Sequence, residues 1–372
     1  MILKNVFKIS KGKKAVESND NNLQRYIQIG DLRSDDKIKY AEHDDKNIIC
    51  NENDVLIAWD GANAGTIGYN LKGVIGSTLA KLSPKVDNIY SPYTGRFLQS
   101  QFRYLRETCT GATIPHISRP TLESLNIPLP PLDQQKKIAA ILDAADAYRQ
   151  KTKALIQKYD ELTQSLFLDM FGDPVGNPKG WERIKLEEIG TISSGSTPSR
   201  KNEENFNGDI PWVKTGEVNS KIILDTEEKI SKTALSNSSC KLYPAGSLII
   251  AMYGQGKTRG QVGLLGIEAS TNQACAVLTK SDKANFIFLY KLIQMSYIDL
   301  RSLGRGGNQP NLNSGILKKY LVINPPFVLQ NQFEYIFQAI ESQKAQAQAS
   351  LAQAEDLFNS LLQRAFKGEL TN

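Results

Sequence analysis

The chain has 372 residues, of which 40% are apolar and 23% are charged, and its formal net charge is +6. That length allows two domains with sizeable cores, and no apolar run approaches the ~20 residues of a membrane span. The N-terminal segment MILKNVFKISKGKK lacks the apolar core and the cleavage site of a signal peptide. Four cysteines lie far apart, and two histidines are too few to complete a zinc site with them. We therefore expect a cytoplasmic protein with reduced thiols and without a membrane span or a bound metal.

The first expected element is a globular segment over residues 1–131, called block 1. Residues 54–58 form a short apolar run bounded by turn residues, which predicts a buried strand. Gly61 and Gly65 follow this run and indicate tight turns where another group can approach the backbone closely. Residues 96–108 have the apolar spacing of a helix. Short strands combined with helices predict a mixed α/β block.

Residues 132–173 are expected to form one long helix. Pro130 and Pro131 oppose helix before this segment, and Pro174 ends it. About 40 residues at ~1.5 Å each make a rod of roughly 60 Å, too long for a core helix of one small domain. On its own, the segment favours a scaffold or a dimerisation coiled coil. Steps of three and four residues predict a stripe that faces a partner helix. The predicted stripe consists of Ile138, Ile141, Ala145, Tyr148, Thr152, Leu155, Tyr159, Leu162 and Leu166.

A second globular segment, called block 2, covers residues 174–325, and a second long helix follows over residues 326–372. Residues 247–251 repeat the pattern of a buried strand, and residues 285–303 have helical spacing. The middle of the last helix, residues 342–350, is rich in Ala and Gln, which favour helix. Both blocks carry more cations than acids, whereas both helices carry slightly more acids. We expect the helices to pair antiparallel and the blocks to attract a polyanion.

The two halves of the chain form an internal repeat, in which most matched positions share one constant offset. Residues 125–132, LNIPLPPL, return as residues 320–327, YLVINPPF. Near the start of each block, residues 7–12 correspond to residues 190–195, at a slightly shorter offset. Each half is therefore a block, a pair of prolines and a long helix. The constant offset also superimposes Ile138 on Phe333, Leu142 on Phe337, Phe171 on Phe366, residues 65–68 on 260–263, and residues 111–115 on 306–310.

Two motifs suggest catalysis, and neither is complete. Residues 251–258 fit a relaxed phosphate-binding loop, but the glycines that follow oppose the helix that such a loop needs. Residues 324–327, Asn-Pro-Pro-Phe, match the tetrapeptide with which amino-group DNA methyltransferases hold a flipped base. No glycine-rich S-adenosylmethionine loop accompanies it, and the first repeat has Leu-Pro-Pro-Leu at the same place. Because no nucleophile or metal constellation remains, we expect the chain not to be an enzyme by itself.

Cations combined with amide and hydroxyl side chains recur on matched loops of both blocks. Arg, Asn and Gln read base edges in the major groove, while Lys neutralises phosphate. For any one of these residues the alternative is a solvated loop charge, but the matched set favours nucleic acid. The predicted DNA contacts in block 1 are Lys11, Lys13, Lys14, Asn63, Thr113, His116 and Arg119. Those in block 2 are Ser194, Ser196, Thr197, Arg200, Lys201, Lys214, Gln255, Lys257, Arg259, Arg305, Asn308, Gln309 and Asn311.

These motifs together resemble the specificity subunit of type I restriction–modification systems over nearly the whole chain. They are ISSGSTP after Trp181, GATIPHI at residues 111–117, GNQPNL at residues 307–312 and IPLPPLDQQKKI at residues 127–138. Each is weak alone, but the ordered set is specific. The second helix departs from this pattern because Val-Leu-Gln at residues 328–330 replaces Asp-Gln-Gln.

The resemblance implies an α+β fold, with two repeated mixed α/β target-recognition domains separated by two long antiparallel helices in a pseudo-twofold arrangement. The helices would be a coiled-coil spacer, and the domains would read a bipartite, asymmetric site in double-stranded DNA. Two modification subunits would hold S-adenosylmethionine and methylate adenine N6, and restriction subunits would use ATP and Mg²⁺, so this chain would bind no cofactor. The alternative is a coiled-coil structural adaptor whose globular domains bind protein.

Overall fold

The computed structural model describes residues 1–111, 113–254, 256–305 and 310–370. It divides into two compact units, described separately below: unit 1 is Met1–Leu155 with Ala347–Asn372, and unit 2 is Ile156–Gln346. Each unit thus combines one block with a part of each long helix. No helix in the described part of the chain is long and apolar enough to cross a membrane.

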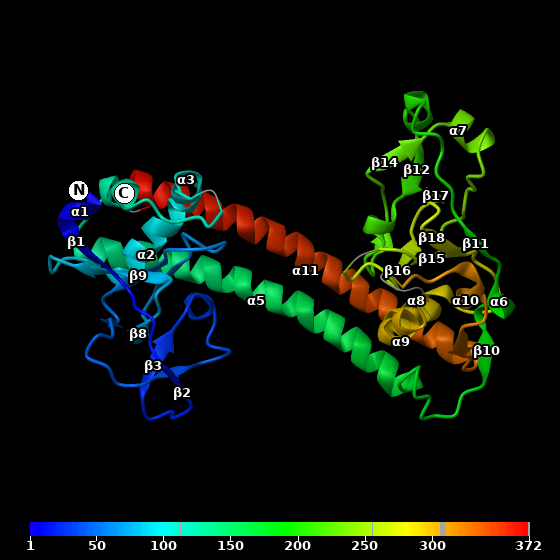
Figure 1. Ribbon diagram of the computed structural model, residues 1–372, viewed down its shortest axis with the longest axis horizontal. Coiled ribbons are helices and arrows are strands. Elements are labelled where there is room, and N and C mark those ends of the chain that lie inside the picture. The colour runs from blue at the N-terminus through cyan, green and yellow to red at the C-terminus, as the bar shows by residue number, and fades with distance from the viewer. Residues whose placement is uncertain (112, 255, 306–309, 371–372) are drawn as a thin grey trace. The chain divides into compact units, whose positions relative to one another are not determined.

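Unit 1 contains two sheets built from short strands (Figure 1). A four-stranded antiparallel sheet has the order β1-β9-β6-β7, and a five-stranded sheet has the order β2-β4-β3-β8-β5, in which β3 and β8 run parallel. The predicted strand at residues 54–58 is confirmed as β6, which is buried along its whole length. The strands are β1 (Phe7–Lys11), β2 (Glu17–Ser18), β3 (Gln24–Ile27), β4 (Tyr40–Ala41), β5 (Ile49–Cys50), β6 (Val55–Ala58), β7 (Ile67–Tyr69), β8 (Gly73–Ile75) and β9 (Leu79–Pro84).

The helical segment predicted at residues 96–108 is broken into two helices at Gln101, whose backbone has φ −92° and ψ 4°. The same break occurs at Ser296, which is the equivalent position in the second half of the chain. The short helices of unit 1 are α1 (Leu3–Val6), the 3₁₀ helix η1 (Gly30–Leu32), α2 (Ser91–Ser100), α3 (Phe102–Glu107) and α4 (Arg119–Ser124).

Unit 2 repeats this arrangement. Its main sheet has the order β11-β18-β15-β16-β13, and a second sheet has the order β14-β12-β17, in which β12 and β17 run parallel. The strands are β10 (Arg183–Lys185), β11 (Ile192–Ser194), β12 (Ile210–Val213), β13 (Ile222–Ile223), β14 (Glu228–Ile230), β15 (Leu248–Ala251), β16 (Val262–Leu265), β17 (Ser270–Thr271), β18 (Cys275–Leu278) and β19 (Leu321–Ile323). The short helices are α6 (Leu186–Ile189), η2 (Glu203–Phe206), η3 (Thr215–Glu217), α7 (Lys232–Ser236), α8 (Phe286–Met295), α9 (Tyr297–Ser302) and α10 (Ser314–Lys318).

The sequence repeat is also a structural repeat. The sheet order β1-β9-β6-β7 in unit 1 matches β11-β18-β15-β16 in unit 2, and the parallel pair β3–β8 matches β12–β17. Equivalent aromatic contacts anchor the long helices in each unit. Phe366 packs on Tyr93 with ring centroids 5.3 Å apart in unit 1, and Phe171 packs on Phe288 at 4.7 Å in unit 2.

The two long helices are continuous, at 40 residues for α5 (Leu132–Phe171) and 41 for α11 (Phe327–Lys367). The Ala/Gln-rich middle of α11 is therefore helical, as predicted. In unit 1, Lys153 on α5 pairs with Glu355 on α11 at 3.0 Å, and in unit 2 Asp160 pairs with Lys344. Within each unit the helices run antiparallel, as expected (Figure 1).

The stripe predicted on α5 is wrong at four of its nine positions. Ile141, Tyr148, Leu155 and Leu162 are 39%, 55%, 42% and 50% exposed, and they recur once per heptad. The less exposed residues are instead the ones that directly follow them along the chain. Those residues are Leu142, Arg149, Ile156 and Thr163.

The inner face of α5 can hold buried hydroxyl side chains because backbone carbonyls of the same helix accept their hydrogen bonds. Thr152 and Thr163 are buried, and their hydroxyls donate to backbone carbonyls one helical turn earlier at 2.9 and 3.0 Å. The guanidinium of Arg149 lies over the ring of Phe358 at 4.5 Å from its centroid. Both candidate stripes have the same heptad spacing, so periodicity could not choose between them. The larger apolar side chains at Ile141, Tyr148, Leu155 and Leu162 are exposed on the outer face of the helix.

A buried glutamine joins each block to the long helix that follows it. In unit 1, Gln135 accepts from the backbone N–H of Tyr90 at 3.0 Å and donates to the carbonyl of Pro130 at 2.8 Å. Gln330, its equivalent in unit 2, accepts from the N–H of Asn285 at 2.9 Å and donates to a proline carbonyl at 2.8 Å. A buried amide left unpaired costs ~1–3 kcal/mol, so this joint is specific. The second helix therefore keeps the joint although it lacks Asp-Gln-Gln.

Candidate nucleic-acid interface

Three loops of each block lie at one edge of its main sheet. In block 1 the strands β1 and β6 both pair antiparallel with β9, so both end at the edge where β9 begins. In block 2 the strands β11 and β15 end at the edge where β18 begins. We name the three loops the first-strand loop (residues 12–16 and 195–199), the glycine loop (59–66 and 252–261) and the bridge loop (110–118 and 305–313). These names refer to the described residues of each range, which leave out residues 112, 255 and 306–309.

The first-strand loop packs so closely on the sheet edge that it requires glycine. Gly12 donates its N–H to the carbonyl of Leu79 at 2.9 Å, and Gly195 donates to Cys275 at 3.2 Å. A Cβ atom would lie 2.3 Å from the carbonyl oxygen of Gly76 if added at Gly12, and 2.3 Å from that of Thr271 if added at Gly195. The loop is thereby fixed, and the predicted contact residue Lys14 is exposed on it.

An arginine from the following helix holds each glycine loop. Arg106 Nη1 donates to the carbonyl of Ala62 at 2.9 Å in block 1. In block 2, Arg301 Nη1 donates to the carbonyl of Arg259 at 2.9 Å, and its Nη2 donates to the carbonyl of Gly256. Arg106 and Arg301 occupy equivalent positions of the repeat, yet neither is among the DNA contacts predicted from the sequence. The constant repeat offset was the signal that could have found them.

The glycine and bridge loops are joined by backbone hydrogen bonds. In block 1 the N–H of Gly61 donates to the carbonyl of Pro115 at 2.9 Å, and in block 2 the N–H of Leu312 donates to the carbonyl of Met252 at 3.0 Å. Each bridge loop is closed by a reciprocal pair of bonds, between Thr110 and His116 in block 1. Arg305 and Asn311 form the same pair in block 2. These bonds bring together the predicted contacts on the two loops that the structure describes.

An acid outside the set of predicted contacts lies within the block 1 loops. Asp60 forms an ion pair with Lys11 Nζ at 2.7 Å and meets His116 Nδ1 at 2.6 Å. Burial disfavours its charged form, but hydrogen bonds from Lys11 and His116 outweigh burial and hold the pKa of Asp60 below its ordinary value. Asp60 therefore offsets the positive charge that the predicted residue Lys11 would present, and it also engages one ring nitrogen of the predicted residue His116.

The other predicted contacts divide into side chains with protein partners and side chains free for a ligand. Arg119 pairs with Glu123 on α4, Asn63 accepts from Arg33, and Thr197 donates to Gln273. Arg200 and Lys214 share Glu228. Within the described residues, six exposed predicted contacts have side chains without a hydrogen-bond or ion-pair partner: Lys13, Lys14, Thr113, Ser194, Lys201 and Lys257. The backbone carbonyls of Ser194 and Lys257 accept from the hydroxyls of Tyr243 and Tyr297 at 3.2 and 2.7 Å. Ser196 contributes its carbonyl to Trp212 Nε1, whereas Gln255, Asn308 and Gln309 lie outside the described residues.

The two motifs that suggested catalysis lie in a strand connection and at a helix start. Lys257 and Thr258 are followed by the strand β16 and not by a helix, so this glycine loop lacks the helix N-terminus of a phosphate-binding loop. The Asn-Pro-Pro-Phe segment leads directly into α11, where Pro326 accepts the first backbone bonds of the helix. Across the described ranges, no group of three or more His, Cys, Asp or Glu side chains could hold a metal.

Two mixed domains with matched cationic and amide-bearing loops, each joined to a long helix, define a class of DNA specificity protein. Residues 1–164 and 178–353 match the family described as "Type I restriction modification DNA specificity domain". The chain belongs to this family, so the resemblance seen in the sequence is confirmed. It is a DNA sequence-specificity component and not a catalytic subunit.

Relatives and solved structures agree with this assignment. The type I restriction enzyme MjaVIII specificity subunit of Methanocaldococcus jannaschii is 28% identical over 341 residues, covering 83% of this chain and 78% of the relative. The EcoKI specificity subunit of Escherichia coli is 21% identical over 362 residues, covering 86% and 75%. The S subunit of a type I restriction–modification system from M. genitalium matches with a TM-score of 0.62 at 17% identity, covering 98% of this chain and 95% of that one. This structural match confirms the predicted fold.

Proposed function

We propose that blocks 1 and 2 each read one half of a bipartite, asymmetric site in double-stranded DNA. The observation that carries this proposal is the recurrence of the same three loops at the same sheet edge in both blocks. The frame is equivalent, but the side chains differ: His116 in block 1 corresponds to Asn311 in block 2, and Thr110 corresponds to Arg305. Two readers with one backbone design and different side chains suit two half-sites of different sequence.

We further propose that two modification subunits assemble on the long helices, hold S-adenosylmethionine and methylate adenine N6. Restriction subunits that use ATP and Mg²⁺ would join the same assembly. Support comes from apolar surface that the chain leaves uncovered. In unit 1 the heptad residues Ile141, Tyr148 and Leu155 are exposed on α5. In unit 2 a groove of about 740 Å³ is lined largely by apolar side chains such as Met170 and Tyr335. Exposed apolar surface of this kind marks interaction sites.

Methylome sequencing of the host with and without this chain tests the proposal. We expect a bipartite N6-methyladenine motif that disappears when the chain is deleted and returns on complementation. Complementation with Lys257→Ala should lower methylation and reduce the salt dependence of DNA binding by about one counterion, because one phosphate contact is lost. Lys280→Ala is the matched control, because Lys280 follows the opposite end of β18. An unchanged methylome after deletion would favour the structural adaptor instead.

Substitution of Tyr148 tests the docking surface. Tyr148→Glu places a charge in the uncovered heptad stripe, and we expect it to lower the amount of modification subunit that co-purifies by at least about tenfold, since burying an unpaired charge is costly. Thermal stability of the isolated chain should stay within ~0.5 kcal/mol, because the side chain is exposed. Ala154→Glu, an exposed position on another side of α5, should leave the assembly intact. Equal recovery of the partner with both variants would contradict the docking surface.

A further inference from the structure

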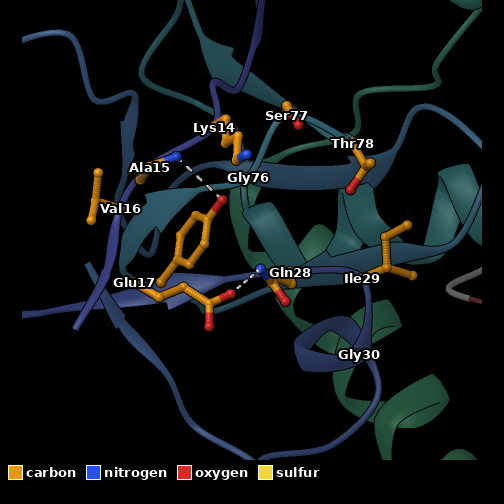
Figure 2. Close-up of a pocket in the computed structure, with 11 residues that line it drawn as sticks. Lys14, Ala15, Val16, Glu17, Gln28, Ile29, Gly30, Gly76, Ser77 and Thr78 are labelled. Atoms are coloured by element: carbon orange, nitrogen blue, oxygen red, sulfur yellow. Dashed lines mark hydrogen bonds between the residues drawn. The ribbon is translucent and has the colours of Figure 1, made fainter. Parts of the chain in front are cut away.

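A hollow of about 880 Å³ opens in block 1 beside the first-strand loop (Figure 2). Glu17 and Gln28 lie side by side along one wall, and Lys14, Ser77 and Thr78 lie across from them. Most of the exposed lining of the hollow is apolar, but polar side chains lie on both of these walls, and the hollow adjoins the loop that carries the exposed Lys14. It therefore lies next to the candidate DNA-binding edge and offers hydrogen-bonding groups there.

The walls of the hollow are fixed by backbone bonds. Where the parallel strands β3 and β8 end, the N–H of Gly76 donates to the carbonyl of Ile27 at 2.9 Å. The N–H of Gln28 donates to Asp31 at 2.8 Å, which holds the chain after β3. The hydroxyl of Tyr26 accepts from the N–H of Ala15 in the first-strand loop, at 3.3 Å. A site held in this way needs little reorganisation on binding.

Glu17 and Gln28 present hydrogen-bond acceptors to the hollow. Gln28 Nε2 donates to Glu17 Oε1 at 3.2 Å, and Lys39 Nζ donates to both carboxylate oxygens of Glu17 at 2.8 and 2.9 Å. The hydrogen bond from Lys39 holds the pKa of Glu17 below its ordinary value, so the carboxylate is ionised at neutral pH. One amide oxygen and the remaining carboxylate lone pairs stay available to a ligand.

Block 2 has the same frame with the charges reversed. Where β12 and β17 end, the N–H of Asn272 donates to the carbonyl of Val213 at 3.1 Å, and the N–H of Lys214 donates to Glu217 at 2.7 Å. Lys214 therefore takes the position that Gln28 has in block 1, directly after the equivalent strand. Arg200 likewise takes the position of Glu17, because each lies at the same distance along the chain from the glycine of its first-strand loop.

The reversed pair in block 2 is also held in place. Arg200 pairs with Glu228 at 2.7 Å, and Lys214 reaches the same carboxylate at 3.1 Å. The guanidinium of Arg200 stacks over Phe206 at 4.1 Å from the ring centroid. Glu228 is the counterpart of Lys39, because each lies opposite one of the equivalent aromatic residues. Glu228 on β14 is paired with Trp212, and the carbonyl of Lys39, directly before β4, accepts from the N–H of Tyr26 at 2.7 Å. An acid with a basic partner in block 1 thus becomes a base with an acidic partner in block 2.

We propose that these equivalent positions determine base specificity: Glu17 and Gln28 contact a base with an exocyclic amino group, and Arg200 and Lys214 contact guanine. This inference rests on the proposed function. Carboxylate and amide oxygens accept from the amino groups of cytosine and adenine, whereas arginine and lysine donate to O6 and N7 of guanine. Arg200 uses only part of its five N–H donors on Glu228, so the remaining N–H groups of the guanidinium can donate to the edge of a base.

The test is methylome sequencing of cells that carry the full assembly with variant chains. Glu17→Gln combined with Gln28→Ala should relax one base position in one half-site, with roughly a ten- to hundredfold loss of discrimination there. Arg200→Ala combined with Lys214→Ala should relax a guanine in the other half-site. Glu52→Gln, an exposed acid outside the hollow, should leave the motif unchanged. Thermal melting of each purified variant checks that the fold is retained.

The outcomes separate this inference from the proposed function. A motif that keeps every position and its discrimination in both double variants would overturn the inference, while loss of that motif on deletion of the chain would still support the function. Relaxation of an A·T pair in place of a G·C pair in the block 2 half-site would also overturn it, because only a G·C pair contains guanine. If no bipartite motif depends on the chain at all, the proposed function itself fails.

Discussion

Insertion of one heptad into both long helices is expected to widen the gap between the two half-sites by about three base pairs. The insertions would follow Leu155 in α5 and Gln346 in α11, where the two compact units meet along the chain. One heptad adds roughly 10 Å of helix, and a base step adds ~3.4 Å. A whole heptad keeps the inner face of each helix in register. The antiparallel pairs Lys153–Glu355 and Asp160–Lys344 lie outside the insertion points and are retained.

Methylome sequencing with the lengthened chain measures this effect directly. Both half-site sequences should be unchanged, because the three loops of each block are untouched. Methylation of the new site should be slower, since about three base pairs rotate one half-site by about a third of a turn around the duplex. A matched control inserts one heptad into α11 alone, which prevents equal pairing of the two helices and should abolish methylation. A double insertion that still methylates the original gap would contradict a spacer role for the helices.

The sequence predicted those parts of the fold whose residues are compatible with a single kind of structure. The internal repeat, the proline pairs and the apolar runs identified both long helices and the central strands β6 and β15. The inner face of α5 could not be predicted, because Ile141 and Leu142 satisfy the same heptad equally well. Packing against block 1 determines which residue faces inward, because Leu142 lies in the core of unit 1. Tertiary packing thus overrode a choice that periodicity left open.

The sequence predicted which loops form the candidate site, but it did not predict which side chains pair with one another there. Gly12 and Gly195 marked the first-strand loops because only glycine fits against the neighbouring carbonyl. The pairing of Asp60 with Lys11 joins residues that are far apart along the chain, and nothing local in the sequence announces it. The hollow beside Gln28 depends on a parallel strand pair that single-sequence patterns do not reveal. Distant partners therefore set the charge of this surface.

Replacement of Arg301 by alanine is expected to weaken DNA binding of the assembly by roughly ten- to hundredfold. The guanidinium holds the carbonyls of Arg259 and Gly256, which fixes the loop that carries Lys257. Gly260 in that loop has φ +86° and lies against Tyr297, so the loop already depends on an unusual backbone. Without Arg301 the loop must be ordered on binding, and fixing each residue costs ~1–2 kcal/mol. Binding assays with duplexes that carry the motif would measure the loss.

Arg301→Lys distinguishes positioning of the loop from a simple loss of charge. Lysine keeps the charge but lacks the planar fork that bonds two carbonyls at once, so it should restore little of the affinity. Arg106→Ala should have the corresponding effect through block 1, because Arg106 holds the equivalent loop. Arg103→Ala is its control, since that exposed arginine pairs with Glu107 on its own helix. Full affinity in the lysine variant would mean that Arg301 acts on phosphate directly, and the arginine pair would then be a DNA contact in place of a loop clamp.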